Sequence, residues 1–204
     1  MTNYFRPILA LMLASAAMPL HAEEAAMDVA AAVGALRRAL PGRPIFLVGH
    51  SAGAHLAALV GVDPAYLGSV GMKPSDLGGV ILLDGAGYDA TGPRGPGIVG
   101  RALDAMYDQA FGPPGDPERA ALSPTLRVTA GGAYPPFLIF HVASRQDAAA
   151  QSRALAAALT GAGGRAEVVS APGETHMTIN RDFGRADDPE GDRAANFIAM
   201  NAGA

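Results

Sequence analysis

The chain has 204 residues, of which 50% are apolar and 17% charged, so it suits one globular domain and is too short for two ordinary ones. Its net charge of −4, with no basic cluster, argues against a nucleic-acid partner, because binding nucleic acid needs several converging Lys and Arg side chains. The sequence has no cysteine, which excludes disulfides, thiolate catalysis, Cys-based zinc sites and a lipoprotein anchor.

The N-terminus has the pattern of an export signal. The basic residue Arg6 precedes an uncharged, mostly apolar run over residues 7–20, and acidic residues follow Ala22. We predict a signal peptide over residues 1–22, cleaved after Ala22, because the run is short for a transmembrane helix. The mature protein would then be periplasmic or secreted, without stable membrane insertion. The alternative is an uncleaved, buried N-terminal helix in a cytoplasmic protein.

Helix and strand patterns alternate from Glu23 onward. Residues 25–40 have apolar residues at helical spacing, residues 44–48 form a short apolar strand pattern, and residues 52–60 are rich in helix formers. Further strands are expected over residues 78–84, 134–142 and 166–170, and further helices over 99–111, 151–159 and 194–200. This alternation predicts an α/β fold, with a mostly parallel sheet and helices on both faces, over residues 23–204.

A long insertion interrupts this alternation. Residues 85–133 are rich in Gly and Pro and contain one expected helix. Such an insertion between strands often forms a lid or specificity loop, and the alternative is a decoration facing solvent.

The most informative motif is Gly49-His50-Ser51-Ala52-Gly53, which matches Gly-x-Ser-x-Gly. Because a strand pattern precedes it and a helix pattern follows, it predicts a nucleophile elbow rather than a glycine-rich turn that happens to contain serine. The two glycines are expected to admit close backbone approach at the sharp turn. The turn would present the Ser51 hydroxyl, and the Ala52 N–H at the helix start would face a developing oxyanion.

A serine hydroxyl needs a base to take its proton, and histidine has the suitable pKa. His176 lies on a loop after strand 166–170 and comes last in the chain, which makes it the predicted base. His50 is committed to the turn, His55 is one turn into the following helix, and His141 lies inside a strand, where a packing role is expected.

Two residues are candidates for the acid that orients the base. Asp147 follows strand 134–142, directly before the unit that carries His176, and is the predicted acid. A helix-capping role for Asp147 would give the same pattern. Asp84, at the end of strand 78–84, is the alternative acid. The sequence has no metal-ligand spacing such as H-E-x-x-H, so no metal or other cofactor is predicted.

Together these motifs resemble the α/β-hydrolase superfamily, especially the esterase/lipase branch with hormone-sensitive-lipase-like carboxylesterases and kynurenine formamidases. The resemblance covers residues 28–200 and rests on the elbow with its helix, the segment around Asp147, and the histidine loop over residues 172–176. It implies that Ser51 is the nucleophile, Asp147 the acid and His176 the base, and that the Ala52 N–H is one oxyanion donor.

The N-terminal part departs from that branch, whose members have three or four strands before the elbow and a His-Gly-Gly oxyanion loop. The only glycines before the elbow here are Gly34 and Gly42, and no His-Gly-Gly occurs. The chain therefore looks like the C-terminal half to two-thirds of such a hydrolase. The strand before Ser51 would become a sheet edge, and a homodimer paired through that edge is a further prediction.

The expected function is hydrolysis of small carboxylic esters through an acyl-Ser51 intermediate, with a small-molecule ester or amide as the substrate. The prevalence of Ala, Leu, Met and Phe favours an apolar acyl or alcohol group. Two alternatives stay open. An aryl-formamidase-type amide hydrolase would use the same tetrahedral oxyanion, and a catalytically weak hydrolase fragment or binding module would explain the missing oxyanion loop.

Overall fold

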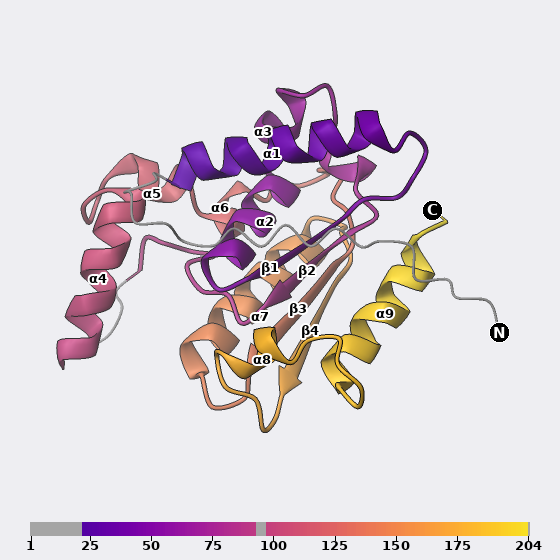
Figure 1. Cartoon of the computed structure of the whole chain (residues 1–204). Helices are drawn as coiled ribbons and strands as arrows, with labels where there is room; N and C mark the ends of the chain where they lie inside the picture. Colours follow the sequence, from indigo (N-terminus) through magenta and orange to yellow (C-terminus); the bar gives the residue numbers. More distant parts are fainter. Residues whose placement is uncertain (1–21, 93–96, 204) are drawn as a thin grey trace.

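The computed structural model describes residues 22–92 and 97–203, so the predicted signal peptide lies outside the described residues except for Ala22 (Figure 1). Its centre is a sheet of four parallel strands in the order β1-β2-β3-β4. The strands are β1 (Phe46–His50), β2 (Gly79–Leu83), β3 (Phe137–Val142) and β4 (Ala166–Ala171). The predicted parallel α/β sheet is thus confirmed. Strands β2, β3 and β4 lie at the predicted apolar runs, whereas β1 begins and ends two residues later than the predicted 44–48, so that His50 ends the strand.

Helices connect the strands as a parallel sheet requires. The described helices are α1 (Ala22–Ala39), α2 (Ala52–Val62), α3 (Pro64–Gly68), the short 3₁₀ helix η1 (Pro74–Asp76), α4 (Gly97–Phe111), α5 (Pro117–Ala121), α6 (Pro124–Arg127), α7 (Gln146–Gly161), α8 (Thr178–Arg181) and α9 (Pro189–Asn201). Helices α7 and α9 begin five residues before their predicted starts at residues 151 and 194. Helix α9 does so because Asp188 caps it and Pro189 takes its first position.

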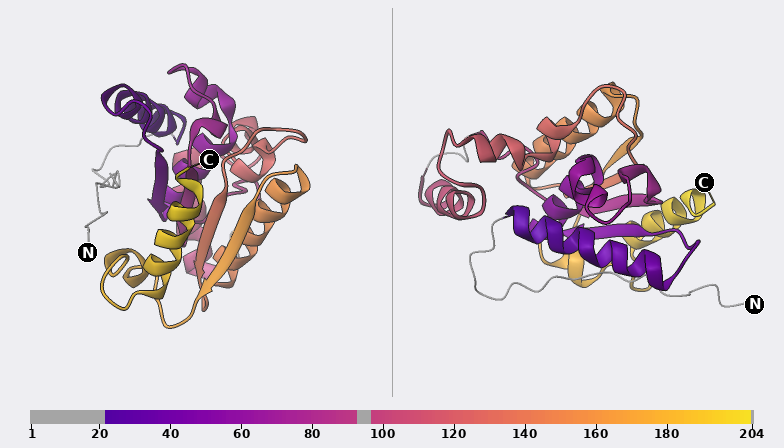
Figure 2. Two further views of the ribbon diagram at one scale, coloured as in Figure 1. Left: turned by 90° about the vertical axis from the view of Figure 1, so that its right-hand side faces the viewer. Right: turned by 90° about the horizontal axis from the view of Figure 1, so that it is seen from above.

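Alternate residues of the central strands face opposite layers of helices, as the two-residue strand period requires. Val80 and Leu82 of β2 belong to the core beneath α2 and α7, whereas Ile81 and Leu83 join a second core with Phe197 of α9. Figure 2 shows the sheet between these layers. All of β2 and β3 is buried, which explains why these strands read as continuous apolar runs.

Helix α1 forms an outer layer over α2 and α3 (Figure 1). Beneath it, β1 pairs on one side only, with β2, among the described strands, and all five of its residues are half-buried. The expectation that the strand before Ser51 forms a sheet edge agrees with this arrangement. None of the helices in the described ranges combines the length and apolar character that a bilayer crossing requires.

The described part of the insertion over residues 85–133 is anchored by buried polar side chains. Arg119 is buried, donates to the carbonyl oxygens of Gly112 and Ala90, and forms an ion pair with Asp108. The buried hydroxyl of Ser123 donates to the Arg119 carbonyl and accepts from the Ala90 N–H. These contacts fix α4, α5 and α6 relative to one another. A lid function for this segment stays a prediction.

Candidate active site

Ser51 lies on a sharp turn between β1 and α2. Its backbone has φ 55° and ψ −120°, a left-handed conformation that a non-glycine residue adopts only when its surroundings impose it. The Ser51 N–H donates to the Leu83 carbonyl at the end of β2, and the Ser51 carbonyl accepts from the N–H groups of Ala54 and His55. The predicted strand–turn–helix context of the serine is therefore present.

The two glycines of the motif have different roles. A Cβ on Gly49 would lie 2.2 Å from the carbonyl oxygen of Gly53 and 2.7 Å from the Ala54 nitrogen, so only glycine fits there. A Cβ on Gly53 would meet nothing within 4 Å. The expectation that both glycines relieve crowding is therefore wrong for Gly53, because its backbone is what crowds Gly49 while its own Cβ direction is open.

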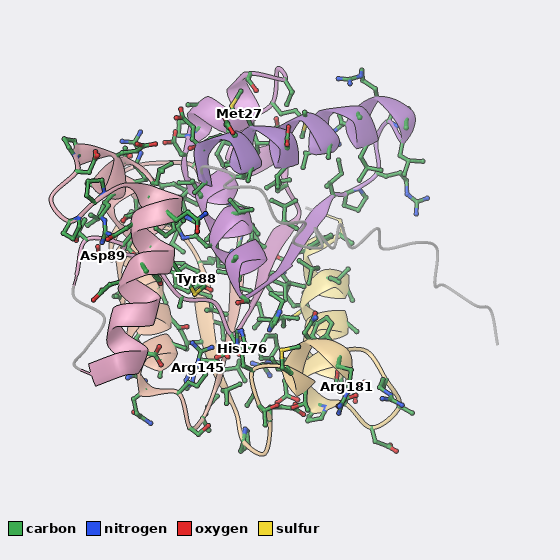
Figure 3. The ribbon with its side chains drawn as sticks, turned by 60° about the vertical axis from the view of Figure 1, so that its left-hand side comes forward. Met27, Tyr88, Asp89, Arg145, His176 and Arg181 are labelled. Carbon is green, nitrogen blue, oxygen red and sulfur yellow. The ribbon has the colours of Figure 1, made fainter. Side chains whose placement is uncertain are left out.

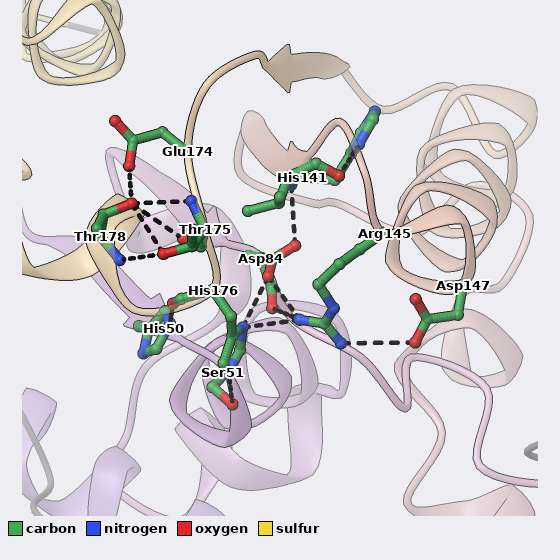
Figure 4. A network of polar contacts seen from close by, with 11 residues as sticks. His50, Ser51, Asp84, His141, Arg145, Asp147, Glu174, Thr175, His176 and Thr178 are labelled. Atoms are coloured by element: carbon green, nitrogen blue, oxygen red, sulfur yellow. Dashed lines mark hydrogen bonds and ion pairs between the residues drawn. The ribbon is translucent and has the colours of Figure 1, made fainter. Parts of the chain in front are cut away.

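His176 lies on the loop between β4 and α8, with its ring between Ser51 and Asp84 (Figure 4). Its Nε2 is 3.0 Å from Ser51 Oγ, and its Nδ1 is 2.7 Å from Asp84 Oδ2. His50 holds this loop from the other side, because its Nε2–H donates to the His176 carbonyl at 2.6 Å. The two histidine rings also lie against each other, with centroids 4.6 Å apart.

Asp84 is fully buried at the carboxyl end of β2 and also has a left-handed backbone, with φ 45°. Its N–H donates to the Phe140 carbonyl and its Oδ1 accepts from the Val142 N–H, so β3 fixes the carboxylate. Burial raises the pKa of Asp84, but hydrogen bonds from His176, Val142 and Arg145 outweigh that effect and hold it below its ordinary value. The carboxylate beside His176 is therefore ionised at neutral pH.

Asp147, the predicted acid, does not contact His176 in this structure. It lies in the first turn of α7 with a side chain that is 62% exposed, and its ion pair is with Arg145 at 3.5 Å. The structure places the alternative, Asp84, against the imidazole instead. The reason is that α7 begins at Gln146, which directs Asp147 outward, whereas β2 delivers Asp84 directly beneath the histidine loop.

Arg145 is the site residue that sequence reasoning missed. Its Nη1 donates to Asp84 Oδ2 at 2.5 Å and lies 2.7 Å from His176 Nδ1. Figure 3 shows Arg145 and His176 as neighbours beyond the ends of the strands. Nothing in Ser144-Arg145-Gln146 forms a recognisable motif, so only the tertiary structure reveals this guanidinium.

Among the described residues, the other three histidines, His50, His55 and His141, have packing or hydrogen-bonding roles, as their positions in the sequence suggested. Burial lowers the pKa of His50 below its ordinary value, although the His176 carbonyl opposes the shift. His55 is buried in α2 beside the Gly87 carbonyl, and burial lowers its pKa to about 4. His141 is buried within β3. Across the described ranges, no three His, Asp or Glu side chains are grouped as they would be around a metal ion.

Ala52, the predicted oxyanion donor, is the first residue of α2 and is exposed next to Ser51. The first N–H groups of a helix have no carbonyl of a preceding turn to bind, and the helix dipole favours negative charge there. Its place therefore agrees with an oxyanion site built on the helix start. The two glycines that precede the elbow lie in α1 (Gly34) and in the turn after it (Gly42).

Comparison with curated protein sequences gives no significant match. Among solved structures, the chain is similar to a butyrate-bound thermophilic esterase from the Planctomycetes species Thermogutta terrifontis (24% identity, TM-score 0.63, covering 89% of this chain and 66% of that one). It is also similar to esterase B from Lactobacillus rhamnosis (19%, TM-score 0.65, 90% and 64%) and to a truncated carbohydrate esterase from gut microbiota (21%, TM-score 0.66, 88% and 68%).

The chain thus spans less than two thirds of the length of the Thermogutta and Lactobacillus esterases. At these identities the likeness shows a shared fold, and it agrees with the resemblance that the motifs indicate. A family model described as alpha/beta hydrolase fold matches residues 17–180. This match spans most of the sequence, including the elbow, Asp84 and His176, and the chain belongs to the alpha/beta hydrolase fold family.

Proposed function

We propose that this protein is a serine hydrolase that cleaves small carboxylic esters. The observation that carries the proposal is the hydrogen-bonded series Ser51 Oγ, His176 imidazole and Asp84 carboxylate, with contacts of 3.0 and 2.7 Å. A nucleophile next to a base, with the base oriented by a buried acid, is the arrangement that activates a serine.

In the proposed mechanism, Ser51 Oγ attacks the ester carbonyl carbon while His176 Nε2 takes the hydroxyl proton. The N–H on His176 Nδ1 donates to Asp84, which stabilises the imidazolium without taking its proton. The tetrahedral intermediate collapses when His176 passes the proton to the departing alcohol, leaving an acyl-Ser51 ester. Water, deprotonated by the same imidazole, then attacks this ester, and His176 returns the proton to Ser51 Oγ as the carboxylic acid leaves.

The negative charge on the tetrahedral oxygen would be met by the Ala52 N–H at the start of α2. Removing one such donor from a hydrolase typically lowers kcat by about 10²–10³. We identify one oxyanion donor, the Ala52 N–H, among the described residues. A site with a single donor would stabilise the oxyanion weakly, and this favours the second candidate function, a hydrolase-derived module with little catalysis.

A small, apolar acyl group is the substrate class that we propose. Related structures support it, because the Thermogutta esterase was solved with butyrate and with propionate bound. An aryl formamide would pass through the same oxyanion and is the alternative substrate.

The proposed function is tested by turnover of short-chain p-nitrophenyl esters and of an aryl formamide, for wild type, Ser51→Ala and Ser75→Ala. Ser75 is an exposed serine in η1, before the start of β2, and serves as the matched control. We expect turnover that Ser51→Ala abolishes and Ser75→Ala keeps. Absence of turnover from folded wild type on every ester and formamide would favour the weak-module alternative.

The export signal and the homodimer remain proposals. Cleavage after Ala22 would leave Glu23 and Glu24 in the first turn of α1, where acidic residues favour the helix dipole. The mass of protein from a periplasmic fraction tests this cleavage, and an intact Met1 would contradict it.

The half-buried β1 edge supports dimerisation. Light scattering that shows a stable monomer at all concentrations would exclude it.

A further inference from the structure

Two threonines close the loop that carries His176 (Figure 4). The Thr178 N–H donates to Thr175 Oγ1 at 3.1 Å, and the Thr175 N–H donates to Thr178 Oγ1 at 2.8 Å. The Ile179 N–H donates to the Thr175 carbonyl at 3.1 Å, so the chain turns into α8 at this point. Two residues three apart that bond each other's N–H groups form a capping box, and we call Thr175 and Thr178 the threonine box.

His176 is the first residue inside the threonine box. The box holds the chain on both sides of His176, and the His50 Nε2–H holds its carbonyl oxygen at 2.6 Å. The contacts of the imidazole with Ser51 and Asp84 therefore start from a backbone that is tied at three points. The threonine box thus determines where the side chain of the base begins.

The Glu174 carboxylate gives the hydroxyl protons of the box a single direction. A carboxylate only accepts hydrogen bonds, so the Thr178 hydroxyl donates in its short contact with Glu174 Oε2. The Thr175 hydroxyl, 3.0 Å away, then donates to Thr178 Oγ1. Each of the two hydroxyl hydrogens and each of the two N–H groups thereby has an acceptor, and a satisfied network of this kind is rigid.

The position of the base matters for the proposed reaction. A base that takes a proton from serine must stay within hydrogen-bond reach of it, and a displacement of about 1 Å can cost about 10² in rate. The histidine loop lies at the surface, with Thr175 and Met177 exposed, and surface loops are ordinarily the more mobile parts of a fold. The threonine box is a tie within this loop that encloses the base.

We propose that Thr175, Thr178 and Glu174 are positioning residues, which keep the His176 imidazole between Ser51 and Asp84 by means of the threonine box. They act through the backbone of His176 and not on the substrate. The effect on turnover rests on the proposed function, whereas the place of the imidazole can be measured without turnover.

Thr178→Val tests the proposal, because it keeps the shape of the side chain and removes both the donor to Glu174 and the acceptor for Thr175. We expect kcat to decrease about 10-fold with KM unchanged within about twofold, since the change acts on the reacting geometry and not on binding. Thr178→Ser restores the hydroxyl and should recover most of the loss. Thr160→Val is the matched control and should match wild type, because the Thr160 hydroxyl donates to carbonyl oxygens of its own helix α7.

Proton NMR reads the position of the base independently of turnover. The His176 Nδ1–H, which donates to Asp84, gives a downfield signal that is assigned by its loss in His176→Ala. We expect this signal in wild type, Thr178→Ser and Thr160→Val, and its broadening or loss by faster exchange with water in Thr178→Val. If Thr178→Val does not fold, Thr175→Val, at an exposed position, removes the acceptor for the Thr178 N–H and should act in the same direction.

Three results are decisive. Wild-type kcat in Thr178→Val, or a Thr178→Ser variant as slow as Thr178→Val, would overturn the proposal. A His176 signal as sharp in Thr178→Val as in wild type would overturn it as well. A signal that depends on the threonine box, in a folded wild-type protein without turnover, would support the positioning role and count against the proposed function.

Discussion

Asp84 Oδ2 lies 2.7 Å from His176 Nδ1, although Asp84 ends β2 and the histidine loop follows β4. The two strands are separated by β3, and the carboxylate reaches across because its Oδ1 is tied to the Val142 N–H at the end of that strand. The neighbouring strand thus fixes the Asp84 carboxylate against His176, whereas Asp147 lies exposed on α7.

This arrangement predicts opposite outcomes for two matched substitutions. Asp84→Asn should lower kcat by roughly 10³–10⁴-fold, because an amide no longer fixes the productive tautomer or stabilises the imidazolium. Asp147→Asn should change kcat by less than about 10-fold, since an exposed pair of this kind is worth about 1 kcal/mol or less. Ester hydrolysis by both variants decides the matter, and a large loss confined to Asp147→Asn would reverse the assignment.

The two motif glycines provide a second matched pair. Gly49→Ala forces a Cβ to within 2.2 Å of the Gly53 carbonyl oxygen and should destabilise the fold by about 3 kcal/mol or more. Gly53→Ala adds its Cβ to open space in the first turn of α2 and should be neutral or stabilise by up to about 1 kcal/mol. Urea unfolding of both variants measures the difference. Equal stability of the two would show that the elbow is not packed as described.

His50 should act on the position of His176 rather than on the chemistry. His50→Phe removes the donor to the His176 carbonyl and should reduce kcat by roughly 10-fold, the worth of about 1.4 kcal/mol. His50→Gln can place an amide N–H where Nε2 lies, and it should recover most of that loss. If the Gln and Phe variants are equally slow, the hydrogen bond is not what matters.

His55 should make the protein less stable in mild acid. Burial lowers its pKa to about 4 in the folded state, against an ordinary value of 6.5. Between these two values the unfolded chain takes up a proton that the folded chain refuses, so the free energy of unfolding decreases as pH falls from 6.5 to 4. The loss should approach about 3 kcal/mol.

The test is urea unfolding of wild type and His55→Asn at several pH values in this range. An Asn amide can still donate to the Gly87 carbonyl but does not titrate, so the variant should show a shallower pH dependence. Parallel pH curves for the two proteins would show that folding does not lower the pKa of His55.

Local patterns were enough to predict the sharp turn that carries Ser51, with the strand before it and the helix after it. The elbow is a strand, a turn and a helix that are contiguous in sequence, so its context can be read directly. His176 was predictable because it follows the last strand, and the carboxyl ends of parallel strands meet at one edge of the sheet.

The acid and Arg145 could not be predicted in the same way. The ends of β2 and β3 are adjacent, with Leu83 paired to Phe140, so an acid after either strand could reach the imidazole. The choice depends on where α7 begins, and that start at Gln146 turns Asp147 toward solvent. The place of Arg145 depends on the packing of three strand ends, which no local pattern encodes.

The central claim is that His176 and Asp84 activate Ser51, and the most direct test is covalent labelling with a fluorophosphonate, read by intact-protein mass spectrometry. We predict one adduct per chain in wild type and in Ser75→Ala, and none in Ser51→Ala or His176→Ala. Folded wild-type protein that takes up no probe, or an adduct that persists in Ser51→Ala, would contradict the claim.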